Sequence, residues 1–253
     1  MEKTRNQVTY IKKRIVRVIV RYKNGGVSTG TGFLISDHGD LLTCFHVVFG
    51  GELRNIRSNQ IYITTTGTDE HSKLQNYFTQ ILNNIEVELP DGTKKQASIK
   101  DFNETFDIAS VKLDSNDKTL FFQIDTKYST EYDESTFFCG FQMATGYSNH
   151  EQYPFATNRA VVSSFPETIV GGDKYSHVQL NSINLGGNSG APLFTEGGKK
   201  VIGIVNGNMN WGNDSVMIND PKTNQPEPKS LRVPLSIAYA TSLKTIKDET
   251  SIL

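Results

Sequence analysis

The stretch GTGFLISDHGDLLTCFHVV, residues 30–48, is the segment that most strongly indicates the fold. It reads as an apolar strand at 31–35, a turn rich in Ser, Asp and Gly at 36–40, and a second short strand at 41–43. Two strands joined by a tight polar turn are typical of an antiparallel sheet. His46 follows the second strand directly, and we therefore treat it as a candidate functional residue.

The same rhythm of short strands and turns runs along the chain. Residues 15–22, IVRVIVRY, are rich in β-branched side chains, and the Asn-Gly-Gly turn at 24–26 follows them. Further strands are predicted at 61–65, 85–89, 97–100, 108–113, 136–141, 158–164, 175–181, 191–194 and 200–205. Apolar residues at spacings of three and four predict a helix over 70–84, and a short helix is predicted within 241–250. The polar stretch 209–230 reads as a long loop. The pattern predicts an all-β protein in two halves.

Composition excludes several classes of function. The chain has 253 residues, with 26 basic and 27 acidic side chains and a formal net charge of −1. Such a balance argues against nucleic acid and membrane surfaces as partners, because both attract strongly basic proteins. The N-terminal sequence lacks the apolar core of a secretory signal, so we expect a cytoplasmic location. Cys44 and Cys139 are then expected to be free thiols.

Three short motifs hold the candidate chemistry: TCFHVV at 43–48, FDIASVKL at 106–113 and GGNSGAPLF at 186–194. Each has an ordinary structural interpretation when taken alone. A histidine after a strand is usually structural, and an aspartate at the start of a strand is usually a turn residue. A glycine-rich loop can also bind phosphate, but such a loop is followed by a lysine and a helix, whereas Ala-Pro-Leu-Phe follows here.

Taken together, and in the order His, Asp, Ser, the motifs resemble the trypsin-like serine peptidases, and most of all the bacterial HtrA (Deg) and V8-like groups. GTGFLISDHGDLLTCFHVV resembles the first hairpin and histidine turn of HtrA proteins, and IEVELPDGTKKQASIKDFNETFDIASVKL, residues 85–113, resembles the strand pair that leads to their acid. HVQLNSINLGGNSGAPLF, KKVIGIVNG and SIAYATSLK resemble the nucleophile loop, the strand along the substrate cleft and the start of the terminal helix.

The resemblance implies two six-stranded antiparallel β-barrels with a short C-terminal helix and a helical insert. The N-terminal barrel is expected over 11–113, carrying His46 and Asp107 and interrupted by the insert 50–84. Residues 114–134 would connect the barrels, and 135–253 would form the C-terminal barrel that carries Ser189.

The resemblance also implies roles for individual residues. Ser189 would be the nucleophile, His46 the base that takes its proton, and Asp107 the group that orients the imidazole. Backbone N–H groups in the loop Gly187-Asn188-Ser189 would stabilise the oxyanion, those of Gly187 and Ser189 above all. Because position 188 is Asn rather than Asp, we expect no activation by cleavage of the chain. We also expect no C-terminal PDZ domain of the kind that HtrA proteins carry.

Substrate preference is harder to predict. Ile183 falls where digestive relatives place the residue at the bottom of the primary pocket, and the absence of an aspartate there disfavours cleavage after Lys or Arg. The strand Asn206-Gly207-Asn208 lacks the histidine of enzymes that cut after Glu, and its backbone would pair with an extended substrate. We expect a small apolar or uncharged residue before the cleaved bond.

Two functions remain open from the sequence. The first is a bacterial, cytoplasmic serine endopeptidase that acts on protein or peptide substrates and is restrained by a regulatory protein partner or by gating through 50–84 or 209–230. The second is a catalytically silent peptide-binding module on the same fold. No Cys or His cluster has the spacing of a metal site, so we expect no metal and no cofactor.

Overall fold

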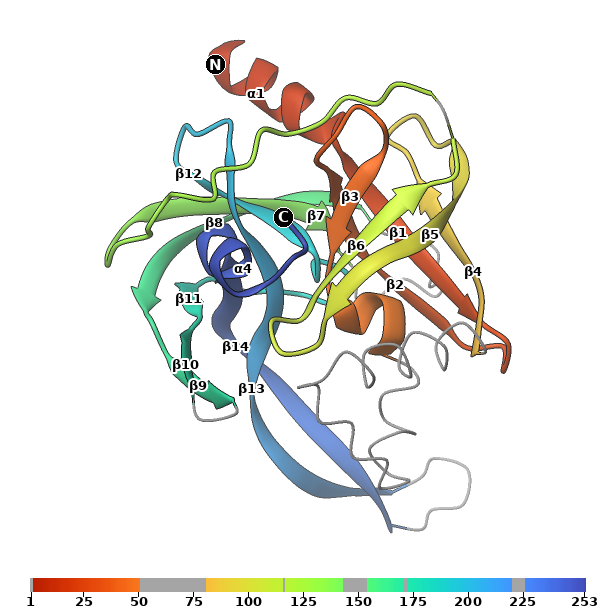
Figure 1. Cartoon of the computed structure of the whole chain (residues 1–253). Helices are drawn as coiled ribbons and strands as arrows, with labels where there is room; N and C mark the ends of the chain where they lie inside the picture. Colours follow the sequence, from red (N-terminus) through yellow and green to blue (C-terminus); the bar gives the residue numbers. More distant parts are fainter. Residues whose placement is uncertain (1, 51–80, 116, 143–153, 171–172, 220–225) are drawn as a thin grey trace.

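The computed structural model places the two halves of the chain in two closed six-stranded antiparallel barrels (Figure 1). It describes residues 2–50, 81–115, 117–142, 154–170, 173–219 and 226–253. In this part of the chain, no helix is long and apolar enough to span a membrane.

The first barrel is built from β1 (Ile15–Tyr22), β2 (Val27–Leu34), β3 (Asp40–Thr43), β4 (Leu82–Glu88), β5 (Lys94–Asn103) and β6 (Ile108–Leu113). Its strands follow the order β1-β2-β3-β6-β5-β4 around the barrel. The turn between β1 and β2 holds Gly25 at a φ of 86°, which only glycine adopts without strain. The hairpin of β2 and β3 is the one that the quoted stretch predicts, with Phe33 opposite Leu42.

The second barrel contains β7 (Ser135–Phe141), β8 (Phe155–Ser164), β11 (Val178–Asn181), β12 (Ala191–Thr195), β13 (Val201–Asn219) and β14 (Pro226–Ser242), in the order β11-β14-β13-β12-β7-β8. A separate hairpin, β9 (Glu167–Val170) with β10 (Asp173–Ser176), precedes β11. The single strand predicted over 175–181 is therefore two strands, interrupted at His177.

The two barrels share a core. Phe122, from the connector, is 1% exposed and packs edge-on against Phe194 of the second barrel, with ring centroids 5.2 Å apart. The same ring meets Phe33 of the first barrel at 6.4 Å. This shared packing fixes one barrel against the other, which matters because the candidate site residues come from both.

Two helices flank the barrels. The C-terminal helix α4 (Leu243–Glu249) begins at Ser242, whose hydroxyl caps the N–H of Thr245, and it buries Leu243 and Ile246. This confirms the predicted terminal helix. The N-terminal helix α1 (Glu2–Lys12) was not predicted, and it is anchored by Ile11, which is buried in the core.

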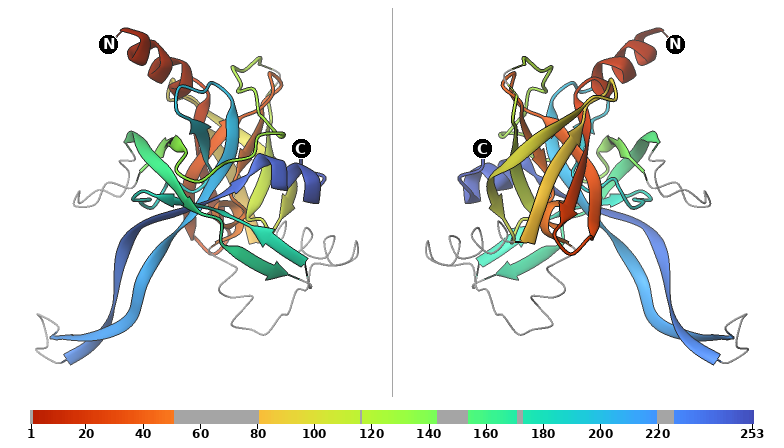
Figure 2. Two further views of the ribbon diagram at one scale, coloured as in Figure 1. Left: turned by 90° about the vertical axis from the view of Figure 1, so that its left-hand side faces the viewer. Right: turned by 90° about the vertical axis from the view of Figure 1, so that its right-hand side faces the viewer.

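The structure corrects the loop predicted over 209–230, whereas two other predicted elements lie largely outside the described residues. The described part of the stretch 209–230 is strand rather than loop: β13 runs on to Asn219 and β14 starts at Pro226, and the two pair as a ribbon that extends away from the barrel (Figure 2). The strand predicted at 61–65 and residues 70–80 of the helix predicted over 70–84 lie outside the described residues; Ile81 is helical, as predicted, whereas 82–84 belong to β4.

Candidate active site

His46 lies in a helical turn over residues 45–50, immediately after β3. The turn is anchored by Phe45 and Phe49, which are buried and pack against each other, with ring centroids 4.6 Å apart, and against Phe102, at 5.4 and 5.1 Å. These aromatic contacts fix the turn while the His46 side chain remains 38% exposed. The imidazole is therefore held by a rigid support and still reaches solvent.

Asp107 lies in the turn between β5 and β6, with a φ of 52°. A residue other than glycine in this left-handed region costs free energy, and such residues concentrate at functional sites. The turn is held by the N–H of Asp107, which donates to the carbonyl of Glu104 at 3.1 Å, and by the side chain of Asn103, which accepts from the N–H of Phe106. This backbone geometry aims the carboxylate at the histidine turn.

The carboxylate of Asp107 forms two hydrogen bonds with His46. Oδ2 lies 2.7 Å from the ring nitrogen Nδ1, and Oδ1 accepts the backbone N–H of His46 at 2.9 Å. A carboxylate only accepts, so the neutral imidazole carries its proton on Nδ1 and has a lone pair on Nε2. The pair therefore fixes both the orientation and the tautomer of the ring.

The same contact changes the acidity of His46. Burial lowers the pKa of the imidazole, but the hydrogen bond from Asp107 and its negative charge act in the opposite direction. The balance leaves the pKa of His46 raised above the ordinary value of 6.5. Such a group takes up a proton readily near neutral pH.

The loop from 182 to 190 carries Ser189 between β11 and β12. Within it, the N–H of Asn188 donates to the carbonyl of Leu185 at 3.3 Å, and Gly187 has a φ of 93°. This is the pattern of a type II turn, which requires a positive φ at its third residue. Among the described residues no group accepts a hydrogen bond from the N–H of Gly187 or of Ser189, so both are available to an incoming oxygen. The N–H of Asn188, predicted with them, is already used.

Thr31, from β2 of the first barrel, holds this loop in place. Its hydroxyl donates to the carbonyl of Gly187 at 2.7 Å and accepts from the N–H of Phe141 at 2.9 Å, and its own N–H donates to the carbonyl of Ser189 at 2.8 Å. Thr31 is fully buried. No sequence signal predicts this role, since 156 residues separate Thr31 from Gly187.

The nucleophile loop and the histidine turn meet in space. An added Cβ at Gly30 would lie 2.5 Å from a methyl group of Val47, next to His46, and 3.0 Å from the carbonyl of Ser189. The carbonyl of Val205 accepts both from the N–H of Gly190, at 2.8 Å, and from the thiol of Cys44, at 3.3 Å. The histidine turn, with Asp107 against it, and the nucleophile loop thus meet at the junction of the two barrels, which we call the crevice.

Of the residues predicted to bind substrate, Asn206 and Gly207 line a cavity together with Asp107. Ile183 is 52% exposed. Gly207 and Asn208 pair with β14 on one side, whereas the pairing of β13 with β12 ends at Val205. The other edge of the strand beyond Val205 thus has no strand beside it among the described residues.

The side chain of Asn206 is held by two hydrogen bonds. Its amide donates to the carbonyl of Phe106, at 3.3 Å, and to the hydroxyl of Thr241, at 2.8 Å. It therefore supports the residue next to Asp107 from behind.

A cavity of about 350 Å³ opens beside the acid and is lined by Asp107, Pro166, His177, Asn206, Gly207 and Tyr239. Burial lowers the pKa of His177, and the charge of Asp107 offsets this only in part. Burial thus disfavours the charged form of His177, which lines the cavity together with Asp107.

Cys44 lies directly behind the His46–Asp107 pair. One ligand atom each from Cys44, His46 and Asp107 lies within 4.8 Å of the others. Burial and the charge of Asp107 raise the pKa of the Cys44 thiol well above its ordinary range, while the N–H of Gly190 acts against this. Both cysteines are free and buried, as expected.

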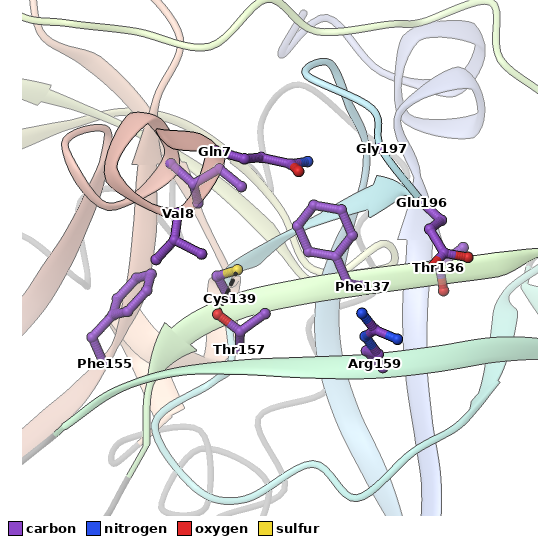
Figure 3. Close-up of a pocket in the computed structure, with 11 residues that line it drawn as sticks. Gln7, Val8, Thr136, Phe137, Cys139, Phe155, Thr157, Arg159, Glu196 and Gly197 are labelled. Carbon is purple, nitrogen blue, oxygen red and sulfur yellow. Dashed lines mark hydrogen bonds between the residues drawn. The ribbon is translucent and has the colours of Figure 1, made fainter. Parts of the chain in front are cut away.

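A second cavity, of about 280 Å³, lies on another side of the molecule, between α1 and strands β7 and β8 (Figure 3). Val8, Phe137, Cys139 and Phe155 give it an apolar lining, and Arg159 lies at one end. None of the residues discussed above for the crevice lines it.

Comparison with known proteins agrees with this architecture. The sequence profile of the family described as "Trypsin-like peptidase domain" matches residues 30–204, which is more than half of the chain. The chain belongs to this family, whose fold is that of the chymotrypsin-like serine peptidases. Over 196 residues it is 26% identical to the serine protease HTRA1A of Danio rerio, which covers 74% of this chain. The chain spans about a third, 32%, of the length of that relative.

Proposed function

We propose that the protein is a serine endopeptidase that cleaves peptide bonds through an acyl-enzyme on Ser189. The observation that carries this proposal is the pair of hydrogen bonds between Asp107 and His46, which leaves the lone pair of the neutral imidazole on Nε2. A serine hydroxyl attacks a carbonyl at neutral pH only when a base removes its proton, and Nε2 of His46 is the base that this arrangement supplies.

The reaction proceeds in two halves. In the first, Ser189 Oγ attacks the substrate carbonyl as its proton passes to Nε2 of His46, and the N–H groups of Gly187 and Ser189 donate to the new oxyanion. His46, now positive, is stabilised by Asp107 and gives the proton to the leaving amine as the peptide bond breaks. In the second half, His46 activates a water molecule that attacks the ester, which releases the acid and restores the Ser189 hydroxyl.

The substrate would bind as an extended strand along the open edge of Gly207 and Asn208, with main-chain hydrogen bonds of the kind found in β-strand addition. Ile183, six residues before Ser189, offers an exposed apolar and uncharged side chain, which supports the preference for a small apolar or uncharged residue before the cleaved bond. The two free, buried thiols support a reducing, cytoplasmic setting. Restraint by a protein partner is part of the same proposal.

The test is cleavage of a peptide library, with products mapped by mass spectrometry. Wild-type protein is expected to cut within peptides after uncharged residues, and the Ser189→Ala variant is expected to cut none. A folded wild-type protein that binds peptides but leaves them intact would favour the alternative, a peptide-binding module on the same fold.

A further inference from the structure

We propose that Cys44, His46 and Asp107 form a binding site for a thiophilic divalent cation such as Zn²⁺, and that occupation of this site switches the peptidase off. The proposal that a metal binds depends only on the arrangement of these three side chains. The inhibition rests on the proposed function, because it acts through His46.

The three side chains are the ones that Zn²⁺ prefers. Zinc binds Cys sulfur at about 2.3 Å, His nitrogen at about 2.0–2.1 Å and carboxylate oxygen at about 2.0–2.2 Å, in tetrahedral geometry. Those bond lengths place neighbouring ligand atoms about 3.4–3.6 Å apart. Here the ligand atoms of Cys44, His46 and Asp107 lie within 4.8 Å of one another, and Nδ1 and Oδ2 are 2.7 Å apart. Binding thus requires the hydrogen bond to open by less than about 1 Å and the sulfur to approach by about 1 Å.

Charge and access favour the same ion. A thiolate, a neutral imidazole and a carboxylate together carry two negative charges, which a divalent cation neutralises. The cluster is reached from the crevice, since the side chains of His46 and Asp107 are 38% and 26% exposed and Asp107 also lines the cavity of about 350 Å³. With three protein ligands, a fourth position is left for water, as in open zinc sites. Hard cations such as Mg²⁺ are disfavoured, because they do not choose thiolates.

The protons balance as follows. The thiol of Cys44 releases its proton to solvent when the Cys44–metal bond forms. The metal takes the lone pair of His46 Nδ1, so the proton on that nitrogen is lost and Nε2 takes one up. One proton is released overall. The ring then carries N–H at Nε2, has no lone pair facing Ser189, and cannot act as its base.

The sequence predicts the pairing of His46 with Asp107 but no metal, because these residues and Cys44 do not have the spacing of a metal site; only the fold brings Asp107, 61 positions from His46, to both of the others. It does provide a matched control. Cys139 is the second buried thiol, and its closest polar partner is the hydroxyl of Thr157 at 3.5 Å, with no histidine or carboxylate forming a cluster there among the described residues (Figure 3). Burial raises its pKa to about 11.

The first experiment measures metal binding independently of peptidase activity. Co²⁺ is titrated into the Ser189→Ala variant, and thiolate-to-cobalt charge transfer is followed in the ultraviolet, with the visible bands of tetrahedral cobalt. We expect one equivalent to bind in Ser189→Ala and in the double variant with Cys139→Ser. The band is expected to vanish in the double variants with Cys44→Ser and with Cys44→Ala, whose thermal unfolding shows that they are folded. No band in Ser189→Ala, or a band that survives the loss of Cys44, overturns the proposal.

The second experiment measures peptide hydrolysis with Zn²⁺ and after addition of a chelator. Each variant is compared with its own metal-free rate. The loss of an outer partner of a metal ligand costs about 10–100-fold in affinity, so loss of the thiolate ligand should raise the Zn²⁺ concentration for half inhibition by at least about 10-fold. Cys139→Ser should leave it unchanged. A cobalt band in a protein that hydrolyses no peptide would uphold the metal site and refute the proposed function. Hydrolysis that saturating Zn²⁺ does not inhibit would refute the switch.

Discussion

Thr31 provides a test of how the first barrel shapes the nucleophile loop of the second. Thr31→Val keeps the shape of the side chain and removes the hydroxyl that bonds Gly187 at 2.7 Å and Phe141 at 2.9 Å. One buried carbonyl and one N–H then lose their partner. An unsatisfied buried group costs about 1–3 kcal/mol, so the loss of two partners should lower the free energy of unfolding by about 2–6 kcal/mol.

The same change should affect catalysis beyond its effect on stability. The carbonyl of Gly187 is held by Thr31, and its release lets the turn that presents the N–H of Gly187 move. A displacement of about 1 Å in a catalytic group can cost about 10²-fold, so kcat should fall by between about 10-fold and about 10²-fold, with KM little changed.

The assays are urea unfolding followed by circular dichroism and peptide hydrolysis under conditions where both proteins are folded. Thr31→Ser is the matched control, because it retains the hydroxyl, and its kcat should stay within a few-fold of the wild-type value. If Thr31→Val kept both its stability and its kcat, or if Thr31→Ser lost as much, the role given to the hydroxyl would be wrong.

Three further predictions concern the acid, the base and the loop. The kcat/KM should rise with pH through an apparent pKa above 6.5, because protonated His46 cannot accept a proton and Asp107 raises its pKa; a midpoint below 6.5 would contradict this. Asp107→Asn should lower kcat by about 10⁴-fold, because the amide favours the wrong tautomer of His46, and a loss below about 10-fold in steady-state assays would count against the pairing. Gly190→Ala should destabilise the fold far more than Gly25→Ala. Both have a positive φ, which costs about 1–2 kcal/mol, but only at Gly190 would a Cβ lie 2.0 Å from the carbonyl of Thr31; equal thermal shifts for the two would refute the clash.

The strands of the barrels could be predicted from the sequence where apolar and β-branched residues form a clear run. The strand at 15–22 buries its apolar residues as the pattern indicates, and 108–113 has the predicted bounds. The ribbon of β13 and β14 could not, because its polar composition is typical of a loop and its pairing depends on partners far along the chain, such as Asn210 with Pro234. Helix α1 was missed since its docking depends on one buried side chain, Ile11.

The candidate site was predictable at the level of residue types and order. The sequence predicts that Asp107 orients His46, and Oδ2 of Asp107 lies 2.7 Å from Nδ1 of His46. The roles of Thr31 and Cys44 beside the site could not be predicted from the sequence, because both residues act through contacts with residues more than 60 positions away. Thr31 resembles any strand threonine, and Cys44 any small buried residue, until both barrels are in place.

Covalent labelling tests the central claim most directly. A fluorophosphonate reacts with a serine hydroxyl only when a neighbouring base and an oxyanion site activate it, and peptide mapping by mass spectrometry locates the adduct. We expect one adduct, on Ser189, that is lost in Asp107→Asn at equal exposure to the reagent. An adduct on a different serine, or an unlabelled protein that is folded and free of metal, would contradict the account.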